Sequence, residues 1–173
     1  MSIEEPQNAR MNHFIEWLNN IRGKETVNIS DEVVADITDE LKKRYHLLFN
    51  VTDLALVEKN MILDVLRQLK MYKYLEHIPY IWNRITGLPN PYISPELEET
   101  LKIMFKQLQV YYIQKNTSML SYSYTLHKFF GILGEKQLVN QIQLIKSREK
   151  LQNQEHIWKD ICEYLGWEFI PSI

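Results

Sequence analysis

The side chains that could form a reactive or metal-binding site are few and scattered in this sequence. The five histidines are spread from His13 to His156, and no two of them stand at the spacing of metal ligands. Ser123 and His127 lie one helical turn apart, but no oxyanion loop or third orienting group accompanies them. Cys162 is the only cysteine, which excludes an internal disulfide and a cysteine-built zinc site. We therefore predict a protein that is not an enzyme, with no metal, no cofactor and no small-molecule substrate.

One short segment has the residue types that bind phosphate. Lys146, Ser147, Arg148 and Lys150 stand at the expected start of the last helix. Backbone N–H groups and the helix dipole favour an anion at such an end, and flanking cations add to this preference. The alternative is that Ser147 only caps the helix and that the charges are solvated. Both interpretations stay open on the residues alone.

Two further groups of cations belong to the candidate surface for nucleic acid or a partner. Lys128 lies in the helix expected at residues 121–133, and residues 115–150 carry six basic residues against only two acidic ones. Lys42, Lys43 and Arg44 end an earlier helix, where cations also stabilise the negative end of the helix dipole without any partner. This uneven distribution of charge favours an anionic partner.

The elements that must position these residues are helices. Apolar residues recur at helical spacing through nearly the whole chain, for example within residues 11–21. Ser30 and Ser94 stand where helices should be capped, and Pro79 predicts a kink or a fresh helix start. Four glycines fall where helices should end: Gly23, Gly87, Gly134 and Gly166. The prediction is an all-α, compact bundle of about seven to eight helices.

The clearest interruption of the helical pattern is LPNPYISP, residues 88–95, because three prolines in eight residues cannot continue a helix. We predict an N-terminal helical lobe at residues 1–90 and a C-terminal helical lobe at 91–173, which carries the basic turn. A chain of 173 residues is long enough to bury one sizeable core, so we expect the two lobes to form one compact unit.

Composition and chain start predict a folded protein of the cell interior. With 45% hydrophobic and 24% charged residues, the chain has the balance of a globular protein rather than of a disordered one. No run of about 18 apolar residues predicts a membrane span. The acidic start MSIEEPQNAR lacks the apolar core of a secretory signal.

Five segments, in their order along the chain, resemble one known family. They are MNHFIEWLNNIRGKE (11–25), KYLEHIPYIWNRITGLPNP (73–91), LSYSYTLHKFFGILG (120–134), LIKSREKL (144–151) and IWKDICEYLGWEFIPSI (157–173). They are similar to the late transcription factor 3-like proteins of nucleocytoplasmic large DNA viruses, which include the poxvirus late gene transactivator and its giant-virus relatives. The resemblance covers nearly the whole chain.

The resemblance implies a viral late gene transcription factor, a transactivator that acts at late promoters with the virus-encoded RNA polymerase. The implied partners are that polymerase or other late transcription factors, and promoter DNA. The implied location is the host cytoplasm or a viral factory, with packaging in the virion as an alternative. Longer family members carry a cysteine-rich segment of zinc-binding type before the part similar to residues 11–25. Because this chain has one cysteine, zinc binding is not carried over; the chain is either the C-terminal domain alone or a short member.

An alternative function is that of a helical protein-interaction module without nucleic-acid contact. Such a module could dock through the aromatic tail at residues 167–170. Against this, a helix end is often followed by a hydrophobic contact back onto the last turn, which predicts that Trp167 and Phe169 pack on the core. The helix that ends in FFGILG resembles the cyclin-like repeats of transcription factor IIB, which implies a cyclin-like C-terminal part.

Overall fold

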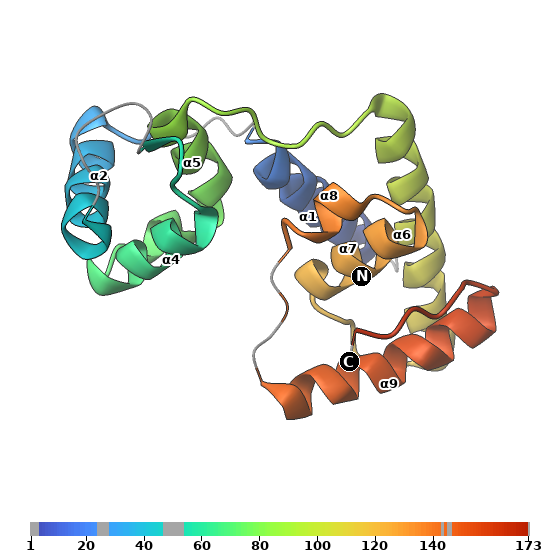
Figure 1. Cartoon of the computed structure of the whole chain (residues 1–173). Coiled ribbons are helices and arrows are strands. Elements are labelled where there is room, and N and C mark those ends of the chain that lie inside the picture. Colours follow the sequence, from blue (N-terminus) through green and yellow to red (C-terminus); the bar gives the residue numbers. More distant parts are fainter. Residues whose placement is uncertain (1–3, 24–27, 47–53, 143, 145–146, 173) are drawn as a thin grey trace. The chain divides into compact units, whose positions relative to one another are not determined.

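The computed structural model describes residues 4–23, 28–46, 54–142, 144 and 147–172 of the chain (Figure 1). Every regular element in this part is a helix: eight α-helices and one 3₁₀ helix. Their order is α1 (Glu4–Arg22), α2 (Asp31–Tyr45), α4 (Lys59–Gln68), η1 (Tyr72–His77), α5 (Ile78–Thr86), α6 (Pro95–Lys115), α7 (Tyr122–Ile132), α8 (Lys136–Val139) and α9 (Arg148–Leu165). The predicted all-α class is confirmed. None of these helices has both the length and the apolar character needed to cross a bilayer.

The helix starts follow the local signals in the sequence. Four helices begin at a serine whose hydroxyl accepts a hydrogen bond from the backbone N–H three residues later, and these serines are Ser30, Ser94, Ser121 and Ser147. Each bond satisfies an N–H group that the first helical turn leaves without a carbonyl partner. At Pro79 the predicted fresh start is observed, since η1 ends at His77 and α5 begins at Ile78 with the proline in its first turn.

The predicted helix ends are confirmed by backbone geometry. Gly23, Gly87, Gly134 and Gly166 all have φ between 67° and 74°, the left-handed region in which a side chain is disfavoured. At Gly87 the N–H group donates to the carbonyl of Asn83 at 2.8 Å. This bond satisfies one of the carbonyls that the last turn of α5 exposes.

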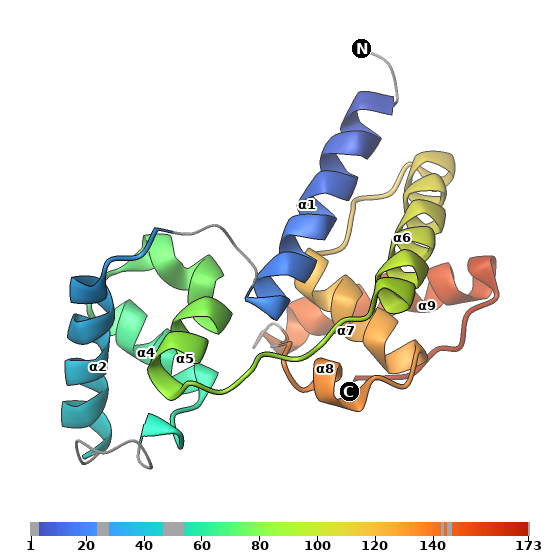
Figure 2. The ribbon, with the colours of Figure 1, turned by 90° about the horizontal axis from the view of Figure 1, so that it is seen from above.

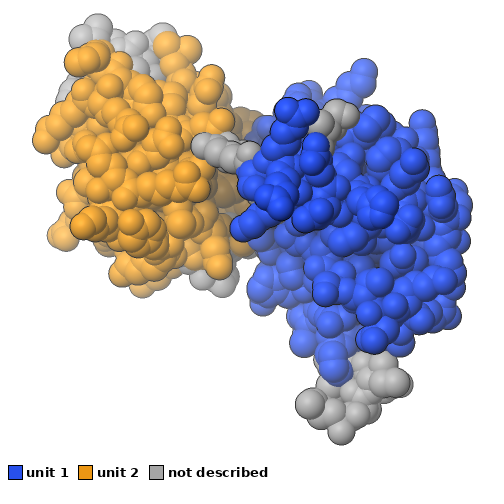
Figure 3. All heavy atoms as spheres, turned by 90° about the horizontal axis from the view of Figure 1, so that it is seen from below, with its two compact units in different colours: residues 1–17, 93–173 blue, residues 18–92 orange. Residues whose placement is uncertain are grey.

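The chain divides into two compact units (Figure 3). Unit 1 contains Met1–Trp17 and Ile93–Ile173, and unit 2 contains Leu18–Tyr92. The predicted division at 90/91 lies close to the passage of the chain into Ile93, but the first 17 residues belong with the C-terminal part. The reason is aromatic packing: the ring of Phe14 in α1 stacks on that of Phe105 in α6, with centroids 4.3 Å apart.

Unit 2 is built from α2, α4, η1 and α5, which Figure 2 shows grouped together. Its core consists of aliphatic side chains that are fully buried, among them Ile37, Leu41, Ile62, Leu66 and Ile81. Two side chains tie the unit together by polar contacts. Trp82 Nε1 donates to the Val57 carbonyl at 2.8 Å. Arg84 of α5 donates to the Ile29 carbonyl at 2.7 Å and pairs with Asp31, which fixes the start of α2.

Unit 1 packs the first part of α1, α6, α7, α8 and α9 around an aromatic core (Figures 1 and 2). The helix α7 is central, because its Phe129 contacts both Phe14 of α1 and Trp158 of α9, each with ring centroids 6.1 Å apart. Phe129 and Trp158 are fully buried. Large rings supply most of the apolar area in such a core, and their edge-to-face contacts add to the stabilisation.

Candidate functional site

The predicted basic turn lies at the start of α9 in unit 1. Ser147 is the N-cap residue, and its Oγ accepts a hydrogen bond from the Lys150 N–H with an N···O distance of 3.4 Å. Arg148 and Lys150 are exposed, and their side chains make no ion pair with any other described residue. Lys146 lies outside the described residues. Ser147 therefore has a capping role, and two cations beside it face solvent.

The charges of this turn are not explained by the helix itself. Cations near a helix N-terminus meet the positive end of the helix dipole, which is unfavourable, and Glu149 is the only acid in the first turn. The N–H groups of Arg148 and Glu149 have no carbonyl partner within the helix, because its first regular bond runs from Leu151 to Ser147. The start of α9 therefore combines N–H groups without a carbonyl partner in the helix and two exposed cations, a combination that favours a phosphate group.

The end of α2 differs, because one of its cations has a structural role within unit 2. Arg44 Nη1 donates to Oε1 of Gln68, the last residue of α4. Gln68 in turn donates through Nε2 to Glu40 Oε1 at 2.8 Å. The guanidinium of Arg44 therefore joins α2 to α4, and this hydrogen-bonded chain accounts for it without an external anion.

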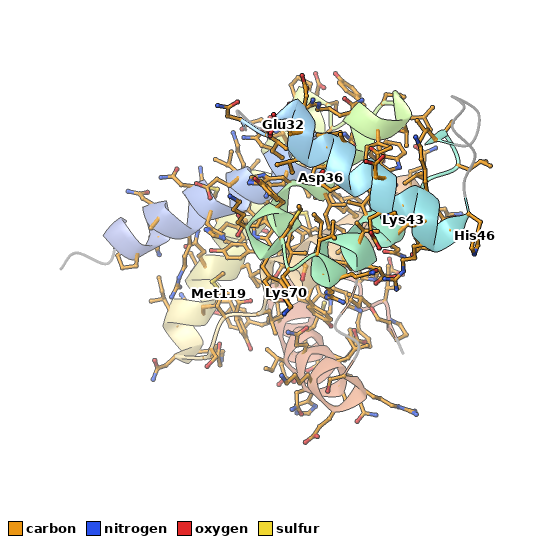
Figure 4. All side chains as sticks on the ribbon, turned by 90° about the vertical axis from the view of Figure 1, so that its left-hand side faces the viewer. Glu32, Asp36, Lys43, His46, Lys70 and Met119 are labelled. Atoms are coloured by element: carbon orange, nitrogen blue, oxygen red, sulfur yellow. The ribbon has the colours of Figure 1, made fainter. Side chains whose placement is uncertain are left out.

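The other cations of α2 stand on a helix with many acids. Lys43 is exposed and shares the outward side of α2 with Glu32 and Asp36, and His46 follows at the end of the helix (Figure 4). Lys42 is half-buried. Cations in this last turn stabilise the negative end of the helix dipole. We therefore regard the α9 turn, which has no such explanation, as the better candidate for a phosphate-binding surface.

Lys128 is placed in the core of unit 1 and not on its surface. Its side chain is only 3% exposed. Its Nζ lies 2.5 Å from Glu155 Oε1 and donates to the Ile170 carbonyl at 2.7 Å. The ammonium group also lies over the ring of Tyr124, 5.4 Å from its centroid. The charge of Lys128 is therefore used within unit 1, and the residue is removed from the predicted surface for nucleic acid or a partner.

Glu155 accepts hydrogen bonds on both of its carboxylate oxygens. Tyr124 donates to Oε1 at 2.6 Å, and the Ser172 N–H donates to Oε2 at 3.0 Å. Burial alone would raise the pKa of Glu155, but the hydrogen bonds from Lys128, Tyr124 and Ser172 outweigh burial and lower the pKa below its ordinary value. Burial and the bond to Glu155 raise the pKa of the Tyr124 hydroxyl. Glu155 is therefore a buried carboxylate with satisfied oxygens.

This buried cluster holds the C-terminal tail, residues 167–172, against unit 1. The tail supplies the Ile170 carbonyl to Lys128 and the Ser172 N–H to Glu155. The ring of Trp167 lies 5.8 Å from those of Phe129 and Trp158, so the prediction that Trp167 packs on the core is confirmed. The ring of Phe169, which is half-buried, lies 5.6 Å from Lys128 Nζ. The tail is thus part of the fold of unit 1.

One feature of the sequence indicates that Lys128 is buried, although its place in a basic stretch suggests an exposed cation. Lys128 is the only Lys, Arg, Asp or Glu in the 11 residues of α7. It stands one turn after Tyr124 and directly before the buried Phe129. A lone cation in a helix this apolar indicates a buried charge, and a buried charge needs a partner of opposite sign. The identity of that partner, Glu155, follows only from the fold.

The residues considered for catalysis or metal binding form no such site in the described part of the chain. No hydrogen bond joins Ser123 to His127 there, and Ser123 Oγ instead lies 3.4 Å from Ser121 Oγ. Burial, with a smaller effect of the nearby Lys128, lowers the pKa of His127. No group of three or more His, Cys, Asp or Glu side chains converges among the described residues. The candidate surface with the clearest chemistry is therefore the start of α9.

Comparison with known proteins gives a consistent result over almost the whole chain. The family described as "Poxvirus Late Transcription Factor VLTF3 like" matches residues 2–169. A protein of Paramecium bursaria Chlorella virus 1, provisionally named a transcription factor, is 36% identical over 168 residues, which are 95% of this chain and 45% of that protein. A protein of Acanthamoeba polyphaga mimivirus with the same provisional name is 35% identical over 168 residues, 95% of this chain and 38% of that protein.

A second mimivirus protein of that provisional name is 26% identical over 108 residues, 60% of this chain and 42% of that protein. The chain thus spans less than half the length of each of these relatives. No solved structure matches the chain, and the cyclin-like resemblance of the C-terminal part stays a prediction.

Proposed function

The chain belongs to the poxvirus late transcription factor VLTF3-like family, and we propose that it acts at viral late promoters together with the virus-encoded RNA polymerase. The family match and the names of the chlorella virus and mimivirus relatives support a role in viral transcription. Action as an activator, the late timing, the polymerase or another late transcription factor as partner, and a location in the host cytoplasm or viral factory are parts of the proposal. The proposal also assigns these roles to this chain, which spans less than half the length of the chlorella virus and mimivirus relatives.

For the mechanism we propose that the start of α9 contacts promoter DNA through the phosphate backbone. The observation that carries this proposal is the exposure of Arg148 and Lys150 beside the N-terminal N–H groups of α9. Contacts of this kind position a protein on DNA without reading base sequence. The expected complex is therefore electrostatic and sequence-independent at this surface, and partner proteins or other regions would supply promoter choice.

The test is the salt dependence of binding to duplex DNA. Neutralised phosphates release counterions, so log K falls linearly with log salt, with a slope of about −0.9 for each phosphate contacted. Replacing Arg148 and Lys150 with alanine should weaken binding and flatten the slope by roughly one to two. The matched control is the Lys106→Ala/Lys159→Ala variant, which removes two exposed cations from unit 1 at other places. Equal slopes for the two variants would remove the α9 turn from the proposed DNA contact.

The alternative function, a protein-interaction module that docks through its aromatic tail, has less support. Lys128 and Glu155 hold the tail by hydrogen bonds, and Trp167 packs on the core of unit 1. A segment fixed in this way has fewer groups to offer a partner. Protein docking through another surface stays compatible with the proposed function.

A further inference from the structure

One face of α6 in unit 1 carries three exposed β-branched side chains in line. Ile103, Val110 and Ile113 are 55%, 48% and 42% exposed. They are seven and three residues apart, so they lie on one stripe of the helix. Single exposed apolar residues are ordinary on protein surfaces, but three in a line on one helix indicate a contact surface.

The other sides of α6 are occupied within unit 1. Phe105 and Leu108 are buried in the core. Tyr164 of α9 covers the next side, where its ring lies 5.2 Å from that of Tyr111 and its hydroxyl is hydrogen-bonded to Gln114. The helix runs along the flank of unit 1 (Figure 1). The stripe is thus the side of α6 that the described part of the unit leaves open.

The spacing of this stripe fits a helical partner. Ile103, Lys106, Val110 and Ile113 follow one another at intervals of three, four and three residues, the spacing of the apolar seam in a coiled coil. We call these four residues the α6 seam. Lys106 is exposed and makes no ion pair with a described residue. A helix packed along the seam would cover Lys106, and a covered ammonium requires an opposite charge.

A second copy of the chain does not meet this requirement. In a parallel pairing in register, Lys106 would face Lys106. In the antiparallel pairing that overlays all four seam positions, Ile103 would face Ile113 and Lys106 would face Val110. Like charges placed together select against the parallel pairing, and the antiparallel pairing puts no acidic side chain opposite Lys106.

We propose that the α6 seam docks an amphipathic helix of a partner protein, whose apolar stripe carries an acidic residue opposite Lys106. The three apolar side chains supply the buried area, and the lysine sets the register and favours an acidic partner helix over a second copy. This inference goes beyond the proposed DNA contact, because the seam is separate from the start of α9 and needs no nucleic acid. The docking of a helix on the α6 seam and the DNA contact at the start of α9 are therefore tested by different measurements.

The experiment uses two synthetic amphipathic helical peptides of three heptads as probes. Both have leucine along the seam, and they differ only at one central seam position, which is Glu in one and Lys in the other. Binding to the full chain is measured by fluorescence anisotropy. The Glu peptide should bind about fivefold more tightly than the Lys peptide, the size expected for exchanging one attractive for one repulsive charge contact. The Lys106→Glu variant should reverse this preference.

Two further variants distinguish binding of the peptides at the α6 seam from nonspecific binding to apolar surface. Val110→Glu should weaken both peptides by about tenfold or more, since it places an unpaired charge in the apolar contact. Val110→Ser makes the same side chain polar without adding a charge. Circular dichroism checks that each variant is folded. Leu56→Glu is the matched control, because it puts the same charge on an exposed apolar residue of unit 2 and should change neither affinity. Equal affinity for both peptides, no binding by either, or a Val110-dependent dimer in sedimentation would each overturn the proposal.

Discussion

Lys128 Nζ and Glu155 Oε1 lie 2.5 Å apart in the core of unit 1, on helices separated by a long stretch of chain. Each of the two charges is also bonded to the C-terminal tail, Lys128 to the Ile170 carbonyl and Glu155 to the Ser172 N–H. One ion pair thus connects α7, α9 and the tail. Removing Lys128, Glu155 or the tail therefore affects the two that remain.

Replacing Lys128 with methionine should destabilise unit 1 strongly. The substitution keeps the apolar length of the side chain but leaves the Glu155 carboxylate without its cation. Breaking a buried pair from one side costs about 3–5 kcal/mol. The measurement is the free energy of unfolding from urea denaturation followed by circular dichroism.

The double variant Lys128→Met/Glu155→Gln is the control for this prediction. It removes both charges, so no unpaired ion is buried, and it should recover part of the loss seen in Lys128→Met. If Lys128→Met were as stable as the parent chain, the pair would have no part in holding unit 1 together.

The stability of the parent chain should fall in acid because of Glu155. Its pKa in the folded state is lowered, while in the unfolded state it titrates near its ordinary value of 4.5. A lowered folded pKa contributes stability that is fully present above the unfolded pKa and is lost as pH falls through the folded pKa. The difference in unfolding free energy between the parent and Glu155→Gln should be constant from about pH 7 to 5.5 and shrink below about pH 4.5. A difference that stays constant down to pH 3 would contradict this assignment.

Deleting residues 167–173 should destabilise unit 1 and not merely remove a docking surface. The deletion removes the ring of Trp167 from Phe129 and Trp158, and it takes one bond from each of the buried charges. We expect a loss of about 3 kcal/mol or more, comparable with the truncation of a large core residue. Thermal unfolding measures it. The point variant Trp167→Ala, whose ring is half-buried, should lose roughly 2 kcal/mol. An unchanged melting temperature after the deletion would instead favour a tail that serves only partners.

The thiol of Cys162 should react slowly in the folded protein. Burial raises its pKa from 9.0 to about 11, and its Sγ lies 3.8 Å from the Glu168 carbonyl of the tail. At pH 8 this shift lowers the thiolate fraction about hundredfold, and the thiolate is the reactive form. Labelling with a disulfide reagent at pH 8 should therefore be at least about hundredfold slower than in urea. The tail deletion should speed the reaction, and equal rates in folded and unfolded chains would contradict the burial of Cys162.

The local signals of the sequence predicted the helices well. Ser30 and Ser94 cap the helices at which they were expected, and Gly87 and Gly166 end theirs with positive φ. Pro79 marks a fresh helix start. These signals act through hydrogen bonds that span three to five residues, so the sequence near each position contains all the information required.

The surface charges were harder to predict. The basic stretch predicts that Lys128, Arg148 and Lys150 are all surface cations, yet only Arg148 and Lys150 are exposed. Arg44 belongs to the same predicted surface, and it bonds to Gln68. Whether a charge is free depends on side chains that are distant in the sequence, which no local pattern contains.

The sequence by itself determined the helical class, the starts and ends of most helices and, through its five matching segments, the viral family. The tertiary structure decided that α1 begins in unit 1, that Lys128 pairs with Glu155, and that the apolar stripe of α6 is exposed. The physical reason is the distance along the sequence over which each kind of interaction acts. Capping and helix termination are settled within one turn of chain, whereas burial of a charge or a ring requires residues that only the folded backbone brings together.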